Sequence, residues 1–348
     1  MRRPLTGILV TSAALLAAVA LAACGNGAAS GGGDPQRKNI RIAYQAFPSG
    51  DLIVKNQQLL EKALPDYTIT WTKFDSGASI NTAFAAGSVD IAAIGSSPVA
   101  RGLSAPLNLP YKVAFVLDVA GDNEALVARN GANVATVTDL RGKKIGTPFA
   151  STAHFSLLAA LEQAGVKESE VTLVDLEPQD ILAAWTRGDL DAAYSWLPSL
   201  DELKKSGKVL ISSRELATAG KPTLDLGVVS TAFVDAHPEA VDAWRKAEAK
   251  ALDLIASDPT AAATAVGREL NLDTDAAQRQ LSQGVFLKPA DLTSPEWLGT
   301  PEKVGGLAGN LHAAAVFLKE QKKIDAVPDR SVFEAAIYTK GLPGVLQP

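Results

Sequence analysis

Hydroxyl side chains gather in three turns of this sequence, each between a strand-like segment and a helix-like segment. The hydroxyl residues of these turns are Ser76, Ser96, Ser97, Ser151 and Thr152. The first turn of a helix has free N–H groups and a partial positive charge, so hydroxyls there can help to hold a small anion without any lysine or arginine. One such turn is uninformative, because Ser and Thr often cap helices. Three of them, each after a strand, favour a shared anion-binding cleft.

The clearest of these turns lies within residues 146–165. A short strand ends there, Ser151 or Thr152 stands at the N-cap position, and Gly165 ends the helix that follows. His154 falls in the first turn of this helix. It either donates a hydrogen bond to a bound oxyanion or packs against the rest of the protein.

Catalysis is a weaker interpretation of the same residues. A serine hydrolase needs a nucleophile, a base and an orienting acid, and His154 is the plausible base. His237 precedes a proline at a predicted helix start, and His312 lies in a predicted helical tail. The Gly-x-Ser-x-Gly motif and the glycine patterns of phosphate and dinucleotide loops are missing. With three His and one Cys in the chain, we expect neither a metal site nor a cofactor.

The bulk composition is that of a soluble globular protein with room for two domains. The chain has 348 residues, of which 47% are hydrophobic and 20% charged, and its net charge is -5. Nucleic acid is not an expected partner, because the sequence has no basic surplus to neutralise phosphates.

The first residues have the pattern of an export signal. Arg2 and Arg3 precede an apolar run, and small residues precede Cys24, the single Cys of the chain. This arrangement resembles the processing box of bacterial lipoproteins, in which the Cys is lipidated. We expect a lipoprotein signal peptide over residues 1–23, a flexible tether over 24–38, and a lipid anchor at Cys24 on the outer face of the cell membrane. A plain signal peptide with a chance Cys, or an uncleaved anchor, is the alternative.

Strand, polar turn and helix alternate along most of the chain. The predicted strands are residues 39–45, 68–74, 89–94, 111–117, 124–129, 143–147, 171–176, 191–195, 209–213 and 223–230. Helices fit between them, among them 52–64, one that starts with Pro98, 152–164, 179–187 and 199–205. From residue 235 onward the chain reads as nearly all helix, including 302–321. This rhythm predicts an α/β fold with parallel sheets and ligands at the carboxyl ends of strands.

Several segments together resemble one known family. Residues 74–80, 95–98, 123–127, 148–161 and 222–225 are similar to the taurine-binding proteins of bacterial taurine ABC importers, within the taurine, alkanesulfonate and nitrate binding superfamily. The resemblance extends over roughly residues 41–234 and fades in the tail. It implies a periplasmic-binding-protein-like type II fold of two doubly wound α/β lobes around a cleft, with a helical C-terminal tail. Lobe 1 would comprise residues 39–122 and 227–348, and lobe 2 residues 123–226.

The resemblance also implies a ligand and the residues that bind it. Taurine is a short zwitterion, and its sulfonate would meet backbone N–H groups and the hydroxyls of the three turns, with His154 as a further donor. Its ammonium would meet Glu124 and Asp225, which lie at the two predicted crossings between lobes. Trp196 would lie against the cation or pack in the core, and Gln45 would be a further polar residue in the wall of the ligand site.

The implied function is delivery of a bound solute to an ABC permease and its ATPase subunits, without catalysis. Three alternatives remain open from the sequence. The ligand could be another aliphatic sulfonate or a small oxyanion such as nitrate. The chain could be an enzyme of the pyrimidine-precursor synthase type on the same fold, or a sensor that signals to a membrane kinase.

Overall fold

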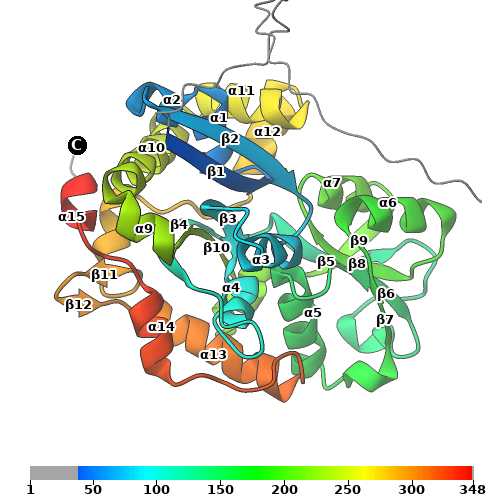
Figure 1. Ribbon diagram of the computed structural model, residues 1–348. Coiled ribbons are helices and arrows are strands. Elements are labelled where there is room, and N and C mark those ends of the chain that lie inside the picture. Colours follow the sequence, from blue (N-terminus) through cyan, green and yellow to red (C-terminus); the bar gives the residue numbers. More distant parts are fainter. Residues whose placement is uncertain (1–37, 347–348) are drawn as a thin grey trace, which may run out of the picture. The chain divides into compact units, whose positions relative to one another are not determined.

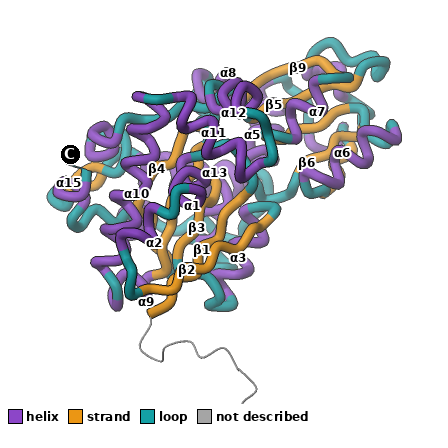
Figure 2. Tube along the Cα trace, turned by 90° about the horizontal axis from the view of Figure 1, so that it is seen from above, coloured by secondary structure: helices purple, strands orange, loops and turns teal. Residues whose placement is uncertain are grey.

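The computed structural model describes residues 38–346 of the chain. The predicted signal peptide, Cys24 and nearly all of the predicted tether lie outside the described residues. Within them, two five-stranded sheets are each surrounded by helices (Figure 1). Seen from above, their strands form two groups (Figure 2). The predicted α/β class, with two doubly wound sheets, is confirmed; the lobe boundaries stay a prediction.

The first sheet has the strand order β2-β1-β3-β10-β4. Its strands are β1 (Lys38–Gln45), β2 (Tyr67–Phe74), β3 (Ile91–Gly95), β4 (Tyr111–Val119) and β10 (Leu224–Ser230). One face packs against α1 (Gly50–Asn56), α2 (Leu59–Ala63), α10 (Pro238–Ser257) and α11 (Pro259–Leu270). The other packs against α3 (Gly77–Ala85), α4 (Ser96–Gly102), α13 (Leu307–Glu320) and α14 (Arg330–Ala336). Helices on both faces explain why β3 is apolar and buried over its whole length.

The second sheet has the strand order β7-β6-β8-β5-β9. Its strands are β5 (Glu124–Arg129), β6 (Lys144–Thr147), β7 (Thr172–Asp175), β8 (Ala192–Trp196) and β9 (Gly207–Ser212). The helices α5 (Thr152–Gln163) and α8 (Ser213–Thr218) pack together beside this sheet, as do α6 (Pro178–Arg187) and α7 (Ser199–Lys204).

Both sheets are mixed, and the prediction of parallel sheets was therefore wrong. β10 runs antiparallel to β3 and β4, and β5 runs antiparallel to β8 and β9. Each of these two strands is the first that the chain forms after it passes from one sheet to the other. The strand therefore starts at the edge where the parallel strands of its new sheet end, and it runs in the opposite direction. As a result, Glu124 lies opposite Trp196 and Asp225 lies opposite Gly95. The antiparallel strands therefore place the side chains of Glu124 and Asp225 at the edge where the parallel strands end.

Three predicted helix limits were also wrong. The helix predicted over 52–64 is broken into α1 and α2, because Gln58 adopts a left-handed backbone (φ 53°) while the apolar spacing continues across the break. Pro98 is the third residue of α4 rather than its first, a position where a missing N–H is equally harmless. Residues 302–304 form part of the hairpin β11 (Gly299–Thr300) and β12 (Lys303–Val304), and Gly305 and Gly306 follow before α13 begins.

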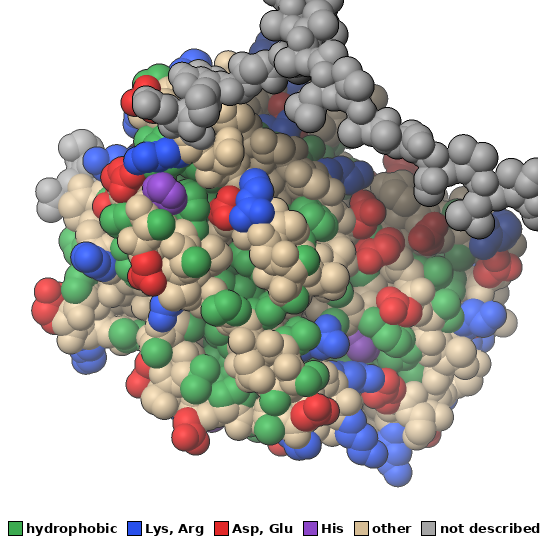
Figure 3. Space-filling view, viewed as in Figure 1, with side chains coloured by type: hydrophobic (Ala, Val, Ile, Leu, Met, Phe, Trp, Pro, Cys, Tyr) green, Lys and Arg blue, Asp and Glu red, His purple; other side chains and the backbone are tan. Residues whose placement is uncertain are grey.

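The helical tail packs on the first sheet. Its other helices are α9 (Thr231–Ala236), α12 (Thr274–Leu281) and α15 (Leu342–Val345), and single 3-10 turns occur at Val137–Leu140, Glu168–Glu170 and Pro289–Thr293. Arg245 of α10 is fully buried and donates hydrogen bonds to the carbonyl oxygens of Ala114 on β4 (3.1 Å), Lys340 (2.8 Å) and Tyr338. Acidic and basic side chains both occur across the face drawn in Figure 3.

Candidate functional site

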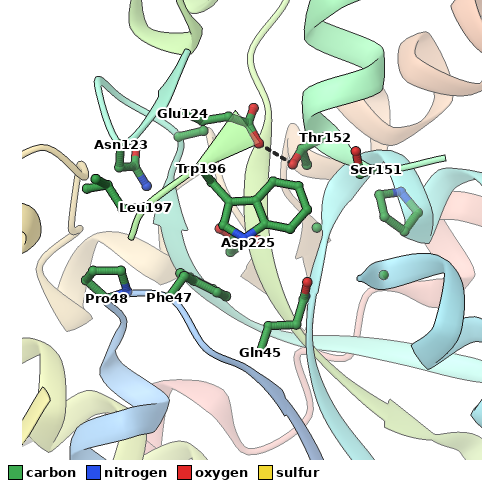
Figure 4. Close-up of a pocket in the computed structure, with 14 residues that line it drawn as sticks. Gln45, Phe47, Pro48, Asn123, Glu124, Ser151, Thr152, Trp196, Leu197 and Asp225 are labelled. Atoms are coloured by element: carbon green, nitrogen blue, oxygen red, sulfur yellow. Dashed lines mark hydrogen bonds between the residues drawn. The ribbon is translucent and has the colours of Figure 1, made fainter. Parts of the chain in front are cut away.

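A small cavity lies where residues of the two sheets meet, and Figure 4 shows its wall. It offers about 30 Å³ to the centres of water-sized groups. One water needs roughly 10–15 Å³ by this measure, so the space suits a short and slender ligand. The wall consists of Gln45, Phe47, Pro48, Gly77, Gly95, Pro98, Ala120, Asn123, Glu124, Ser151, Thr152, Trp196, Leu197 and Asp225.

Strand ends and helix starts position these side chains. Gln45 ends β1 and Trp196 ends β8, while Glu124 opens β5 and Asp225 is the second residue of β10. The first turns of α3 and α5 contribute Gly77 and Thr152. A Cβ atom added at Gly95 would come within 2.6 Å of the methyl carbon of Thr152. Helix α5 therefore approaches the end of β3 at a position where only glycine fits without a shift.

Six of the ten predicted site residues line this cavity: Gln45, Glu124, Ser151, Thr152, Trp196 and Asp225. The other four do not. The Ser76 hydroxyl donates to Glu177 at 2.8 Å, and the Ser96 hydroxyl accepts from the backbone N–H of Leu224 at 3.0 Å. Ser97 is buried, with no partner for its hydroxyl in the described part of the chain.

His154, the fourth, has a structural role. Its Nδ1 accepts a hydrogen bond from the backbone N–H of Ala150 (3.1 Å), a residue in the left-handed region (φ 57°). The ring stacks on Phe149 with centroids 4.5 Å apart. Burial, and then the charge of Lys323, lowers the pKa of His154 to about 3, so the ring is neutral. His154 thus holds the turn before α5 in place; it is not among the wall residues, and its Nε2 is buried with no partner within residues 38–346.

The hydroxyl protons of the third turn are already engaged. Ser151 donates to the carbonyl oxygen of Pro148 at 2.5 Å, and its oxygen accepts from the backbone N–H of His154 at 3.1 Å. Thr152 donates to Glu124 at 2.5 Å. What α5 offers an anion at this end is therefore its first-turn N–H groups other than that of His154, since such groups have no partner within a helix. Local sequence could not reveal this, because Glu124 and Thr152 are far apart along the chain.

Glu124 is buried and surrounded by hydroxyl donors. Besides Thr152, it accepts hydrogen bonds from Ser213 (2.7 Å), Ser156 (3.3 Å) and Thr223 (3.5 Å). Burial raises the pKa of Glu124, and these hydroxyls lower it. The network supports a charged carboxylate at the cavity wall.

Asp225 has a different environment, because its neighbours are acids. It pairs in register with Asp118 on β4, which is 0% exposed. Burial, and then the charges of neighbouring carboxylates, raises the pKa of both groups. The sequence analysis missed Asp118, although a lone carboxylate within the apolar run of residues 113–119 was a signal. The wall itself contains carboxylates but no lysine or arginine.

The remaining wall residues that the sequence analysis missed are mostly apolar. Phe47, Pro48, Pro98, Ala120 and Leu197 carry no polar group in their side chains, so nothing in their type pointed to a ligand. The side-chain oxygen of Asn123 stabilises the turn that precedes β5, because it accepts a hydrogen bond from the N–H of Gly121 at 2.6 Å.

Residues 38–346 contain neither a candidate metal site nor a candidate membrane-spanning helix. No group of three or more His, Asp or Glu side chains there is arranged to hold a metal ion. No helix in the same range combines the length and apolar character needed to cross a membrane.

Comparison with known proteins gives a consistent picture. Residues 73–262 match the family model described as NMT1/THI5 like. The chain is 36% identical to the taurine-binding periplasmic protein of Escherichia coli K12, over 84% of this chain and 89% of that protein. It is 30% identical to a putative aliphatic sulfonates-binding protein of the same strain, over 58% of this chain and 60% of that protein. The fold matches that of the alkanesulfonate-binding protein SsuA of Xanthomonas axonopodis pv. citri, solved with MOPS bound. The TM-score is 0.73 at 22% sequence identity, and the match covers 88% of this chain and 100% of that one.

Proposed function

The chain belongs to the NMT1/THI5-like family, and from this premise we propose that it is the solute-binding component of an ABC importer, with taurine as its ligand. It binds taurine in the cavity of Figure 4 and delivers it to the permease and ATPase subunits. The protein catalyses nothing in this account. Its closing motion is a shift between open and closed states that the ligand favours.

One observation carries this proposal. The cavity wall contains carboxylates that no cation of the wall neutralises, and it also contains the first turn of a helix. Glu124 and Asp225 bring negative charge, and Asp118 stands behind Asp225. Unit charges 4 Å apart interact by about 4 kcal/mol at an effective dielectric constant of 20, so a purely anionic ligand would be repelled by these groups. A ligand with an ammonium at one end and an anionic group at the other fits both parts.

Each end of taurine then has a partner. The ammonium lies between Asp225 and Glu124, where the ring of Trp196 adds a contact worth about 0.5–2 kcal/mol. The sulfonate faces the first-turn N–H groups of α5 beside Ser151, where Gly77 and Gly95 also belong to the cavity wall. The cavity offers only about 30 Å³ to the centres of water-sized groups, which favours this short molecule over bulkier aliphatic sulfonates.

Thermal unfolding with added solutes tests the proposal. Taurine at a hundredfold excess over its Kd should stabilise the folded protein by about 2.7 kcal/mol. Ethanesulfonate, nitrate and sulfate at the same concentration should raise the Tm much less, because they lack the ammonium. If no sulfonate shifts the Tm, the proposed function is wrong. If longer sulfonates shift it more than taurine does, the ligand assignment is wrong.

We also propose export and a lipid anchor at Cys24, which lies outside the described residues. Cells that express the full chain should incorporate labelled fatty acid into it and keep it in the membrane fraction. The variant Cys24→Ser should lose the label and leave that fraction, because the thiol that carries the lipid is gone. Equal labelling of the variant and the natural chain would contradict the anchor.

A further inference from the structure

A row of buried carboxyl groups runs from the cavity wall into the first sheet and its helices. This carboxyl row consists of Asp225 on β10, Asp118 on β4, Asp51 on α1 and Glu248 on α10. Residues directly opposite each other in an antiparallel pair have their Cβ atoms about 4.5–5.5 Å apart on one face of the sheet, so Asp225 and Asp118 are neighbours. Asp118, Asp51 and Glu248 are 0%, 3% and 1% exposed.

The carboxyl row has too few donors for its oxygens. Both oxygens of Asp118, Oδ2 of Asp51 and Oε2 of Glu248 have no hydrogen-bond partner within residues 38–346. Ser49 donates to the other oxygen of Asp51, and the indole N–H of Trp244 donates to the other oxygen of Glu248 (3.0 Å). A buried acceptor without a donor is costly, and two adjacent carboxylates cannot both stay ionised at low cost.

The groups that face Asp118 are all acidic. They are Asp225 of β10, Asp51 of α1 and Glu124 of β5, and Glu248 of α10 acts on Asp51 in turn. The cations on the helices packed here are engaged elsewhere. Lys55 of α1 pairs with Glu269, and its charge lowers the pKa of Asp51 less than burial raises it. Arg245 of α10 binds backbone carbonyls and Asp242.

The pKa values agree with this geometry. Burial, and then Asp225, raises the pKa of Asp118 well above its ordinary value. Burial, and then the charges of Glu124 and Asp51, raises the pKa of Asp225 to about 7. The two carboxyls titrate as a pair, and one proton between them gives the row the donor that it lacks.

We propose that Asp118 and Asp225 share a proton in the empty protein and release it when the ammonium of the ligand binds. Asp118 is thus a positioning residue that sets the pH range in which the site accepts a cation. The inference rests on the proposed function, because it requires a ligand with an ammonium group. No bond is made or broken except that of the proton, which passes to the solvent.

The direction of the pH dependence follows from the raised pKa values. Below the pKa of the empty pair, binding displaces a proton, and the affinity for taurine rises with pH by up to about tenfold per unit. Above that pKa the pair is already ionised, so affinity levels off and no proton is released. The ammonium and sulfonate of taurine do not themselves titrate near pH 6, so the proton comes from the protein.

Titration calorimetry of the full mature chain with taurine measures this proton directly. The heat is recorded near pH 6 in phosphate and in bis-tris, buffers that differ in ionisation enthalpy and are not sulfonates. We expect about one proton released per taurine near pH 6 and close to none near pH 8.5. The variant Asp118→Asn should release clearly less proton near pH 6, because the amide donates a fixed hydrogen bond to Asp225 in place of the shared proton, while burial, Glu124 and Asp51 still act on Asp225. The control Asp275→Asn, an exposed acid of α12, should behave as the natural chain does.

The outcomes separate the two proposals. Binding without proton exchange in the natural chain overturns this inference alone. Unchanged proton release in Asp118→Asn overturns the role of Asp118. If taurine gives no binding heat at either pH, the proposed function fails and this inference fails with it. If Asp118→Asn does not fold by circular dichroism, the measurement on the natural chain still decides.

Discussion

Replacing Asp225 by alanine should weaken taurine binding by roughly a hundred- to several-thousand-fold. The ammonium would lose the carboxylate that neutralises it in the closed cavity, and breaking one partner of a buried ion pair costs about 3–5 kcal/mol. Asp225 lines the cavity, and its side chain meets that of Asp118 across two strands that are already paired through their backbones, so the loss should fall on binding rather than folding. Titration calorimetry near pH 8, where the carboxyl is ionised, gives the affinity.

The matched control is ethanesulfonate, which differs from taurine only by the missing amine. Its affinity for Asp225→Ala should equal or exceed its affinity for the natural chain, because the variant removes a negative charge that faces an anion. Asp275→Ala should leave both ligands unaffected, since Asp275 is exposed on α12. Equal losses for the two ligands would show that Asp225 supports the shape of the site and not the ammonium.

Adding a methyl group at Gly95 should weaken the binding of every ligand alike. The Cβ atom of Gly95→Ala would come within 2.6 Å of the methyl carbon of Thr152, which belongs to the other sheet's helix α5. Overpacking of this kind costs about 1–3 kcal/mol, or roughly a 5- to 150-fold loss of affinity. Calorimetry with taurine and ethanesulfonate should give similar factors for both.

The control for this variant is Gly344→Ala, where an added Cβ meets nothing within 4 Å. It should bind both ligands as the natural chain does. Natural affinity in Gly95→Ala would mean that the contact between Gly95 and Thr152 is no part of the bound state. A loss confined to taurine would instead assign Gly95 to the recognition of the ammonium.

The sequence predicted the fold well where local pattern and local chemistry agree. The strand over 124–129 and the helix that starts at Thr152 follow from apolar spacing and an N-cap serine, and the structure has both. The resemblance to taurine-binding proteins is confirmed by the comparisons. Strand direction was not predictable in this way, because the composition of β5 and β10 is the same in either direction. Their direction is set by the points at which the chain passes from one sheet to the other.

The site was harder to predict, because a side chain's type does not say where its proton goes. Ser96 and Ser76 have the hydroxyls expected of an anion site, but Leu224 and Glu177 engage them, over a hundred residues away along the chain. His154 accepts through Nδ1 from the turn before it, which its position in the sequence did not indicate. The sequence marks Asp118 only as a lone carboxylate in an apolar run, and its pairing with Asp225 is known only from the position of β10 in the sheet.

One measurement tests the central claim that paired carboxylates select a ligand with an ammonium. Calorimetry of the natural chain near pH 8 compares taurine with ethanesulfonate. Charge-assisted hydrogen bonds contribute about 1.5–3 kcal/mol each, so two carboxylates predict that taurine binds at least about a hundredfold more tightly. Equal or tighter binding of ethanesulfonate would contradict the account.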